Sequence, residues 1–170
     1  MLFRSGDFPR AEEAFRQALR MNAADGDTLH NYAWFLCQQR RFDEADAQFG
    51  AAQRAPGYQG VARSMMAQGV CQARSQRLDQ AERTLSRAYE LDPSNPATAV
   101  NLSEVLYRRG EYERARFYVR RVNVNDELVS AQTLWLAARI ERKLGQAAQV
   151  KALGDQLRAR FPDSPEALRY

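Results

Sequence analysis

Few side chains in this sequence have the type and spacing that catalysis or metal binding requires. There is one histidine, His30, and a histidine-based triad needs a nucleophile and an acid held around it. Cys37 and Cys71 lack the C-x-x-C spacing of zinc sites. The carboxylate pairs at Glu12–Glu13 and Asp43–Glu44 are more typical of solvated helix faces than of acid–base catalysis. We therefore expect a protein that is not an enzyme and that uses no metal ion or cofactor.

The elements that position side chains in this chain are paired helices. Over residues 29–55, apolar residues recur at three- and four-residue spacing on both sides of a turn at Gln39–Phe42. This pattern predicts two helices packed as a hairpin. The small residues Ala33 and Ala45 suit a close approach of the two helices, and Phe49 fills the space between them.

The same hairpin pattern recurs along the chain with a period close to 34 residues. Equivalent small or branched residues are separated by 34, 36, 34 and 35 residues, and a large apolar residue precedes each of the first four by three positions. A period of this length with small and aromatic positions in register is the signature of tetratricopeptide repeats (TPRs). The equivalent residues are Ala11, Ala45, Ala81, Ala115 and Val150, and the preceding ones are Phe8, Phe42, Leu78 and Tyr112.

We therefore predict an all-α fold, a right-handed superhelical TPR solenoid that forms a single domain over residues 1–170. Asp25 or Asp27 is expected to cap the second helix, and Ser164 to cap the last one. The predicted units are a half repeat over 1–25, repeats over 26–59, 62–95, 96–130 and 131–164, and the start of a capping helix over 164–170. Besides the hairpin described above, helices are expected over 7–21, 61–75, 78–91, 96–109, 112–122, 128–144 and 146–160.

Composition and charge exclude two further classes of protein. The net charge is +4 and the isoelectric point is near 9.3, but the arginines alternate with acidic residues along the predicted helices, as on ordinary solvated faces. We therefore expect no nucleic-acid partner. The sequence has no run of 18 apolar residues that would span a membrane. Leu2 and Phe3 match the end of a first helix, so we expect the natural protein to extend upstream, and the lack of a visible lipobox says little about export.

The first helices of TPR hairpins line the concave face of the solenoid, where such proteins bind their partners. The side chains expected there form an apolar and aromatic floor with arginines at one end, which suits an acidic or carboxylate-bearing protein segment. For each tryptophan, packing between repeats is an equally good interpretation. The predicted groove residues are His30, Asn31, Trp34, Arg63, Met66, Arg74, Asn101, Tyr107, Arg108, Trp135 and Arg139.

A soluble co-chaperone that clamps a C-terminal carboxylate is a competing class. Such a clamp needs five Lys, Asn and Arg donors, and this sequence supplies two of them, Asn101 and Arg139. The carboxylate would be left largely unpaired, so we reject this ligand. A generic TPR adaptor that binds a peptide segment in its groove stays as the alternative function.

The two cysteines are separated by 34 residues, one repeat, and both lie on first helices. Neighbouring first helices pack about 8–10 Å apart between their axes, so a disulfide between Cys37 and Cys71 depends on favourable Cβ directions. From spacing alone, two buried thiols and a disulfide are equally consistent with the sequence.

Several strings in the chain go beyond what TPR packing demands. NYAWFLCQQRRFDEA (31–45), QGVCQARSQRLDQAE (68–82), LAARIERKLGQ (136–146) and RFPDSPEA (160–167) resemble the TPR pilotin family of type IV pili, known as PilF or PilW. The resemblance covers nearly the whole chain. It departs from the family at Ala33, where glycine is usual, and in the lipobox region, which is missing.

The resemblance implies a lipoprotein on the periplasmic face of the outer membrane, anchored only through an N-terminal lipid that this chain lacks. Its role would be to localise or multimerise the secretin pore, or to stabilise the assembled pilus. The partners would be the outer-membrane secretin or other pilus-assembly proteins. Cys37 and Cys71 match the paired cysteines of the family, which favours a disulfide. We expect a monomer.

Overall fold

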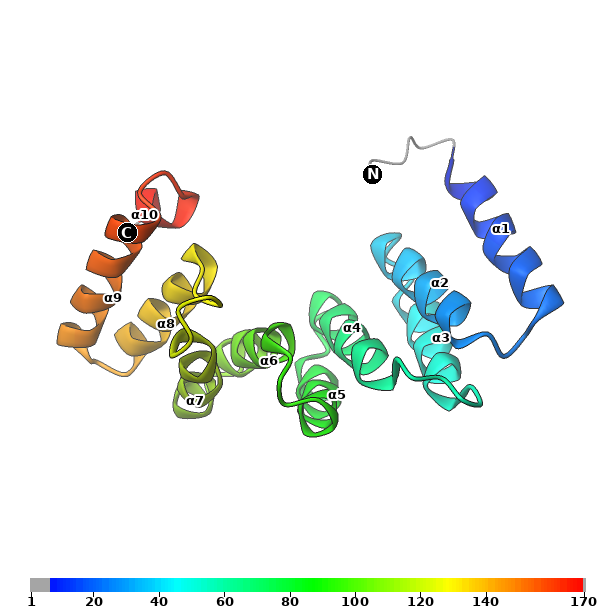
Figure 1. Ribbon diagram of the computed structural model, residues 1–170, viewed down its shortest axis with the longest axis horizontal. Coiled ribbons are helices and arrows are strands. Elements are labelled where there is room, and N and C mark those ends of the chain that lie inside the picture. The colour runs from blue at the N-terminus through cyan, green and yellow to red at the C-terminus, as the bar shows by residue number, and fades with distance from the viewer. Residues whose placement is uncertain (1–6, 170) are drawn as a thin grey trace. The chain divides into compact units, whose positions relative to one another are not determined.

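The computed structural model describes residues 7–169 and consists of helices joined by short turns (Figure 1). No strand occurs within this range. The all-α TPR fold predicted from the sequence is confirmed. The helices are α1 (Phe8–Met21), α2 (Gly26–Gln38), α3 (Phe42–Arg54), α4 (Val61–Arg74), α5 (Leu78–Leu91), α6 (Pro96–Arg108), α7 (Tyr112–Asn123), α8 (Ala131–Lys143), α9 (Ala147–Arg160) and α10 (Pro165–Arg169).

The chain divides into two compact units at the turn after α5. Unit 1 runs to Leu91 and contains α1 to α5, and unit 2 begins at Asp92 and contains α6 to α10. In unit 1, α2 pairs with α3 and α4 pairs with α5. In unit 2, α6 pairs with α7 and α8 pairs with α9, while α10 packs on α8 and α9. The unit boundary falls between the α4–α5 pair and the α6–α7 pair.

The start of α8 differs from the prediction. The helix expected from residue 128 begins at Ala131. Ser130 forms a capping box with Thr133: the Ser130 hydroxyl accepts from the Thr133 N–H, and the Ser130 N–H donates to the Thr133 hydroxyl. Because this reciprocal cap satisfies the first free N–H groups of the helix, it sets the starting residue, and the apolar residue Leu128 stays in the preceding turn. The predicted caps Asp25 and Ser164 are confirmed at α2 and α10.

The core of the first three complete hairpins is built from a buried triplet on the second helix, spaced at i, i+4 and i+7. In α3, Ala45, Phe49 and Ala52 are fully buried between the paired helices. The triplets of α5 and α7 are buried in the same way. In α3 and α5, alanine at both ends of the triplet lets the helix axes approach, and the central side chain fills the remaining space. Truncating such a central residue to alanine costs about 3–5 kcal/mol when it is phenylalanine. The other two triplets are Ala81, Leu85, Ala88 and Ala115, Val119, Val122.

The turn inside every complete hairpin uses one residue in the left-handed region of the backbone. Arg40, Gln76, Gly110 and Gly145 take φ values of 62°, 66°, 81° and 73°. The residue after each donates its N–H to a carbonyl five residues back, as Glu111 does to Leu106. This is the hydrogen-bond pattern that closes a helix with a left-handed residue. Glycine meets this demand without strain in two of the four turns, and arginine and glutamine meet it in the other two.

A disulfide links the two hairpins of unit 1. Cys37 on α2 and Cys71 on α4 are bonded, with their Cα atoms 5.9 Å apart. Both side chains are buried in the cluster that also holds Tyr32, Leu36 and Phe49. Two first helices that are not consecutive in the chain are therefore joined covalently through the core.

Candidate functional site

In unit 1, the residues predicted to line the groove differ in how exposed their side chains are. Asn31, Arg63 and Arg74 are exposed, while Trp34 and Met66 are half-buried. Arg63 pairs with Asp27 at 2.9 Å. Arg74 lies with one guanidinium nitrogen 3.9 Å from the Cys37 sulfur. The exposed part of the predicted set in this unit is therefore polar, and Trp34 is its main aromatic member.

His30 does not belong to the groove, and this part of the prediction is wrong. Its side chain is buried, with 9% exposed, and its ring meets the ring of Phe49 edge-on at 5.8 Å between centroids. Burial lowers the pKa of His30, and the nearby Arg63 guanidinium lowers it further. The physical reason is that α2 buries an unusually wide stripe of its surface, because α1, α3 and α4 all pack against it.

In unit 2, two predicted groove residues, Tyr107 and Arg139, contact each other, and Arg139 also contacts Glu104. The Arg139 guanidinium on α8 lies 4.3 Å from the centroid of the Tyr107 ring on α6, a cation–π geometry. The same guanidinium reaches Glu104 at 3.4 Å. Asn101 donates its amide to the Ala97 carbonyl one turn back. Trp135 is half-buried on α8, and Arg108 is exposed at the end of α6. The first helices of unit 2 are thus linked by their predicted groove residues.

An apolar groove lies between α1 and α2. Two of the predicted residues, Asn31 and Trp34, line it. It encloses about 630 Å³. Its walls are small or aromatic on the α1 side and mixed on the α2 side. The lining residues are Ala11, Ala14, Phe15, Ala18, Thr28, Asn31, Trp34, Phe35 and Gln38.

Comparison of α1 with the other second helices explains why this groove exists. Ala11, Phe15 and Ala18 are the counterparts of Ala45, Phe49 and Ala52, but Ala11 and Phe15 are only partly buried and Ala18 is exposed. In the complete hairpins a preceding first helix covers these positions. Within residues 7–169, no helix precedes α1. The repeat pattern predicts that Ala18 faces inward like Ala52, but Ala18 is exposed among the described residues, and the triplet lines an open groove.

Aromatic contacts fix the floor of this groove. The Phe15 ring stacks on Tyr32 at 5.3 Å between centroids and tilts against Phe35 at 5.6 Å. Trp34 packs beside the same core cluster with part of its ring exposed. These contacts fix the orientation of the Phe15 and Phe35 rings. The groove is therefore a preformed apolar surface of the kind that buries an apolar segment.

An ion-pair cluster fixes α1 beside α2 and so holds the groove wall in position. Glu12 on α1 accepts hydrogen bonds from Arg41 at 2.7 Å and from the Tyr32 hydroxyl at 2.8 Å. Hydrogen bonds from the Arg41 guanidinium and the Tyr32 hydroxyl, with the positive charges of Arg41 and Arg16, lower the pKa of Glu12 to about 2. The carboxylate therefore stays ionised at neutral pH and anchors α1 to the next hairpin.

Most of this groove lies outside the predicted set of residues, because binding positions were expected only on first helices. Asn31 and Trp34 were predicted, whereas Phe15, Ala18 and Phe35 were not. The signal was nevertheless present: α1 carries the apolar triplet of a second helix, and within residues 7–169 no first helix of its own hairpin covers it.

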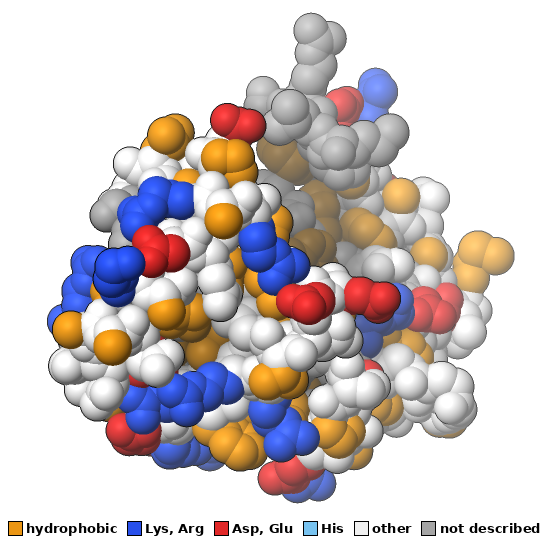
Figure 2. All heavy atoms as spheres, turned by 60° about the vertical axis from the view of Figure 1, so that its left-hand side comes forward, with side chains coloured by type: hydrophobic (Ala, Val, Ile, Leu, Met, Phe, Trp, Pro, Cys, Tyr) orange, Lys and Arg blue, Asp and Glu red, His pale blue; other side chains and the backbone are white. Residues whose placement is uncertain are grey.

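Residues 7–169 contain neither a side-chain cluster suited to a metal ion nor a helix that could span a membrane. No cluster of three or more His, Cys, Asp or Glu side chains suited to a metal ion occurs in the part of the chain that the structure describes. Over the same residues, no helix combines the length and apolar character needed to cross a bilayer. On the face of unit 2 seen in Figure 2, basic and acidic side chains are interspersed with apolar ones rather than gathered by sign.

Comparison of the sequence and the fold with those of known proteins shows the family of this chain. Residues 2–69 and 71–127 match the tetratricopeptide repeat model. The chain is similar to the type IV pilus assembly protein PilF of Pseudomonas aeruginosa, with 26% identity over 156 residues that cover 92% of this chain and 62% of PilF. It therefore spans about three-fifths of the length of that relative.

Two solved structures agree in both sequence and fold. The crystal structure of PilW, described as a widely conserved type IV pilus biogenesis factor, matches with a TM-score of 0.87 and 30% identity, covering 95% of this chain and 74% of that one. A structure of Pseudomonas aeruginosa PilF matches with a TM-score of 0.75 and 25% identity, covering 94% and 71%. The chain belongs to the tetratricopeptide repeat proteins and, within them, to the type IV pilus biogenesis family of PilF and PilW.

Proposed function

We propose that this protein is a non-enzymatic scaffold that acts as a pilotin, localising or multimerising the outer-membrane secretin of a type IV pilus system or stabilising the pilus. The observation that carries the proposal is the agreement with PilW along 95% of the chain in both sequence and fold. TPR proteins of this family act by binding other proteins, and the described residues supply apolar and charged contact surfaces for that task.

We place the partner contact at the groove between α1 and α2. Three features support this choice: the groove is lined mostly by apolar side chains, its Phe15 and Phe35 rings pack against each other and Phe15 stacks on Tyr32, and the half-buried Trp34 lines it. Tryptophan at the border of a preformed apolar groove is typical of residues that contribute strongly to binding. The occupant we favour is an apolar segment of the secretin. The upstream first helix expected from the sequence is the competing occupant, and unfolding of Ala18→Arg, seen as a large loss of melting temperature, would identify it.

We also place the protein in the periplasm, attached to the inner face of the outer membrane through a lipid outside this chain. The family supports this location, and the disulfide between Cys37 and Cys71 suits it, because disulfides persist in oxidising compartments and are rare in the bacterial cytosol.

The decisive experiment is a gel assay for heat-stable secretin multimers in cells that lack the gene. The full-length gene is restored as wild type, as Ala18→Arg or as Gln17→Arg. Both residues are exposed on α1, but only Ala18 lines the groove. Arginine is a good helix former, so both variants keep α1 helical. We expect multimers with the wild type and with Gln17→Arg, and their loss with Ala18→Arg.

The other outcomes separate the parts of the proposal. Normal multimers and normal pili in the deletion strain contradict the pilotin role and leave a generic TPR adaptor as the function. Multimers that disappear on deletion and return equally with both variants support the role but contradict the groove as its contact surface.

A further inference from the structure

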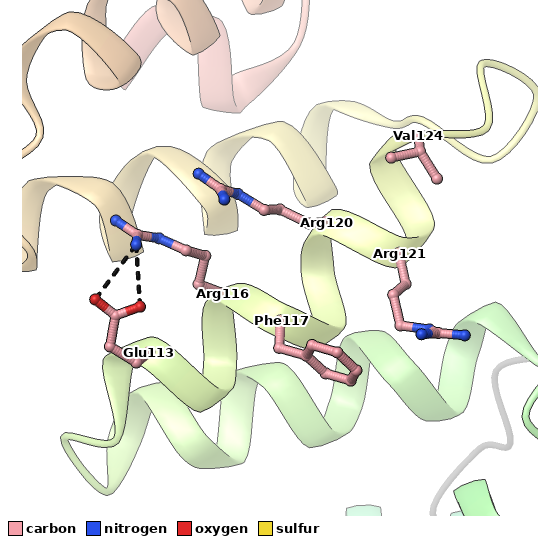
Figure 3. Close-up of a pocket in the computed structure, with 6 residues that line it drawn as sticks. All are labelled: Glu113, Arg116, Phe117, Arg120, Arg121 and Val124. Atoms are coloured by element: carbon pink, nitrogen blue, oxygen red, sulfur yellow. Dashed lines mark hydrogen bonds and ion pairs between the residues drawn. The ribbon is translucent and has the colours of Figure 1, made fainter.

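The outer face of α7 carries a strip of residues that the fold does not need. Phe117, Arg121 and Val124 follow one another at i, i+4 and i+7, on the side of α7 away from its buried residues Ala115 and Val119. Phe117 is 53% exposed and Val124 is 82% exposed. In Figure 3, Phe117 and Arg121 project from one side of α7, while Arg116 and Arg120 project from another.

The repeats of the chain provide an internal control for this strip. All second helices meet the same packing demand, so a residue required by the fold recurs at equivalent positions. At the positions of Phe117 and Arg121, α3 has Ala47 and Ala51, and α5 has Arg83 and Arg87. At the position of Val124, these two helices have Arg54 and Glu90. The aromatic ring and the branched aliphatic side chain are thus specific to α7 and are not explained by hairpin packing.

The arginines in and beside the strip differ in whether they form ion pairs within the protein. Arg116 pairs with Glu113 at 3.0 Å and with the buried Glu141 at 2.6 Å, and Arg120 also reaches Glu141 at 3.1 Å. Arg121 lies 5.3 Å from the centroid of the Phe117 ring. Among the residues that the structure describes, no carboxylate pairs with Arg121. Its donors therefore point to solvent beside an exposed aromatic ring.

Around the strip is an open groove of about 630 Å³, lined by Glu113, Arg116, Phe117, Arg120, Arg121 and Val124. Its lining carries three arginines and one glutamate, so its net charge is positive. An arginine within about 6 Å of an exposed aromatic ring is a frequent centre of binding energy at protein interfaces. We propose that this face of α7 docks an acidic protein segment, with an apolar side chain against Phe117 and Val124 and a carboxylate on Arg121. The proposal concerns a second surface and holds whether or not the α1–α2 groove binds the secretin.

The test is a titration followed by amide chemical shifts. The probe is an unstructured peptide of about twelve residues in which Asp and Glu surround a Phe-Leu pair. A matched peptide carries Lys at every acidic position. The proteins are the wild-type chain, the double variant Phe117→Ser/Arg121→Ser, and the double variant Arg83→Ser/Arg87→Ser, which removes two arginines from the equivalent exposed face of α5. All four positions are exposed, so circular dichroism is expected to show unchanged helicity.

The expected result is a saturable shift of the amides of α7 with the acidic peptide and none with the Lys peptide. Affinity is expected to fall at least about tenfold in the α7 variant, equivalent to about 1.4 kcal/mol, and to stay unchanged in the α5 variant. An equal loss in both variants would show general attraction of anions, and absence of saturation up to about 1 mM peptide would show no site. Phe117-dependent binding to vesicles of anionic lipid in place of the peptide would assign the strip to a membrane surface. Each of these three results overturns the proposal.

Discussion

Cys37 and Cys71 are bonded across 5.9 Å between Cα atoms, and this disulfide joins α2 to α4 past the intervening helix α3. In a solenoid each hairpin is stabilised mainly by its neighbours. The disulfide makes the first two complete hairpins into one covalently closed unit, which also supports α1 and its groove.

The first prediction is that opening this disulfide destabilises unit 1. A loop of 34 residues is closed by the bond, and the chain-entropy model assigns such a loop about 3–4 kcal/mol. The variant Cys37→Ala/Cys71→Ala is expected to lose this amount in chemical unfolding. Reductant should destabilise the wild type to a similar extent and leave the variant unaffected. Labelling of two thiols in unfolded, unreduced protein would show that the bond is absent.

The second prediction concerns stability in acid. The pKa of Glu12 in the folded protein is about 2, below the ordinary value of 4.5, because Arg41, Tyr32 and Arg16 favour the carboxylate. The stabilisation is therefore fully present above about pH 4.5 and is lost as the pH falls through about 2. The variant Glu12→Gln is expected to be less stable at pH 7 and to show a flatter decline of melting temperature over this range.

The control for this pH dependence is Glu13→Gln, on the neighbouring exposed position of α1. Glu13 contacts only the exposed Arg20 among the interactions seen for it. An exposed ion pair contributes little to stability. If Glu13→Gln flattens the acid limb as much as Glu12→Gln does, the assignment to Glu12 is incorrect.

The third prediction is that the contact between α7 and α8 depends on one buried carboxylate. Glu141 is nearly inaccessible, with 4% of its side chain exposed, and accepts from both Arg116 and Arg120. Replacing it by leucine leaves Arg116, whose side chain is only 18% exposed, without its main partner, so we expect a loss of about 3–5 kcal/mol in unfolding free energy. The double variant Glu141→Leu/Arg116→Leu is expected to recover part of the loss. If the double variant is less stable than the single one, unpaired charge is not the cause.

The fourth prediction uses the same substitution at two glycines with opposite results. Gly110 has a φ of 81° and open space around it, so alanine there meets backbone strain and not a clash. We expect Gly110→Ala to lower stability by about 1 kcal/mol. Gly50 lies inside α3, where an added Cβ would approach only the mobile end of Arg54 at 3.2 Å. We expect Gly50→Ala to raise stability by about 0.5–1 kcal/mol. Changes of the same sign in thermal unfolding would contradict this explanation.

Local sequence signals predicted the helices well where each residue acts within its own hairpin. Ser164 caps α10 and Asp25 caps α2 because a cap needs only a side-chain oxygen near free N–H groups. The same signals placed the start of α8 three residues early, because the reciprocal bonds of Ser130 and Thr133 outweigh the apolar pattern at Leu128.

The sequence by itself determined the repeat register, because equivalent small and large residues return every 34 to 36 positions. It also determined which side of each second helix is core. Only the tertiary structure decided which candidate surfaces are accessible. Burial depends on every helix packed against a position, and those neighbours come from elsewhere in the chain. For this reason His30 lies in the core, Ala18 lines a groove, and Phe117 stays exposed on α7.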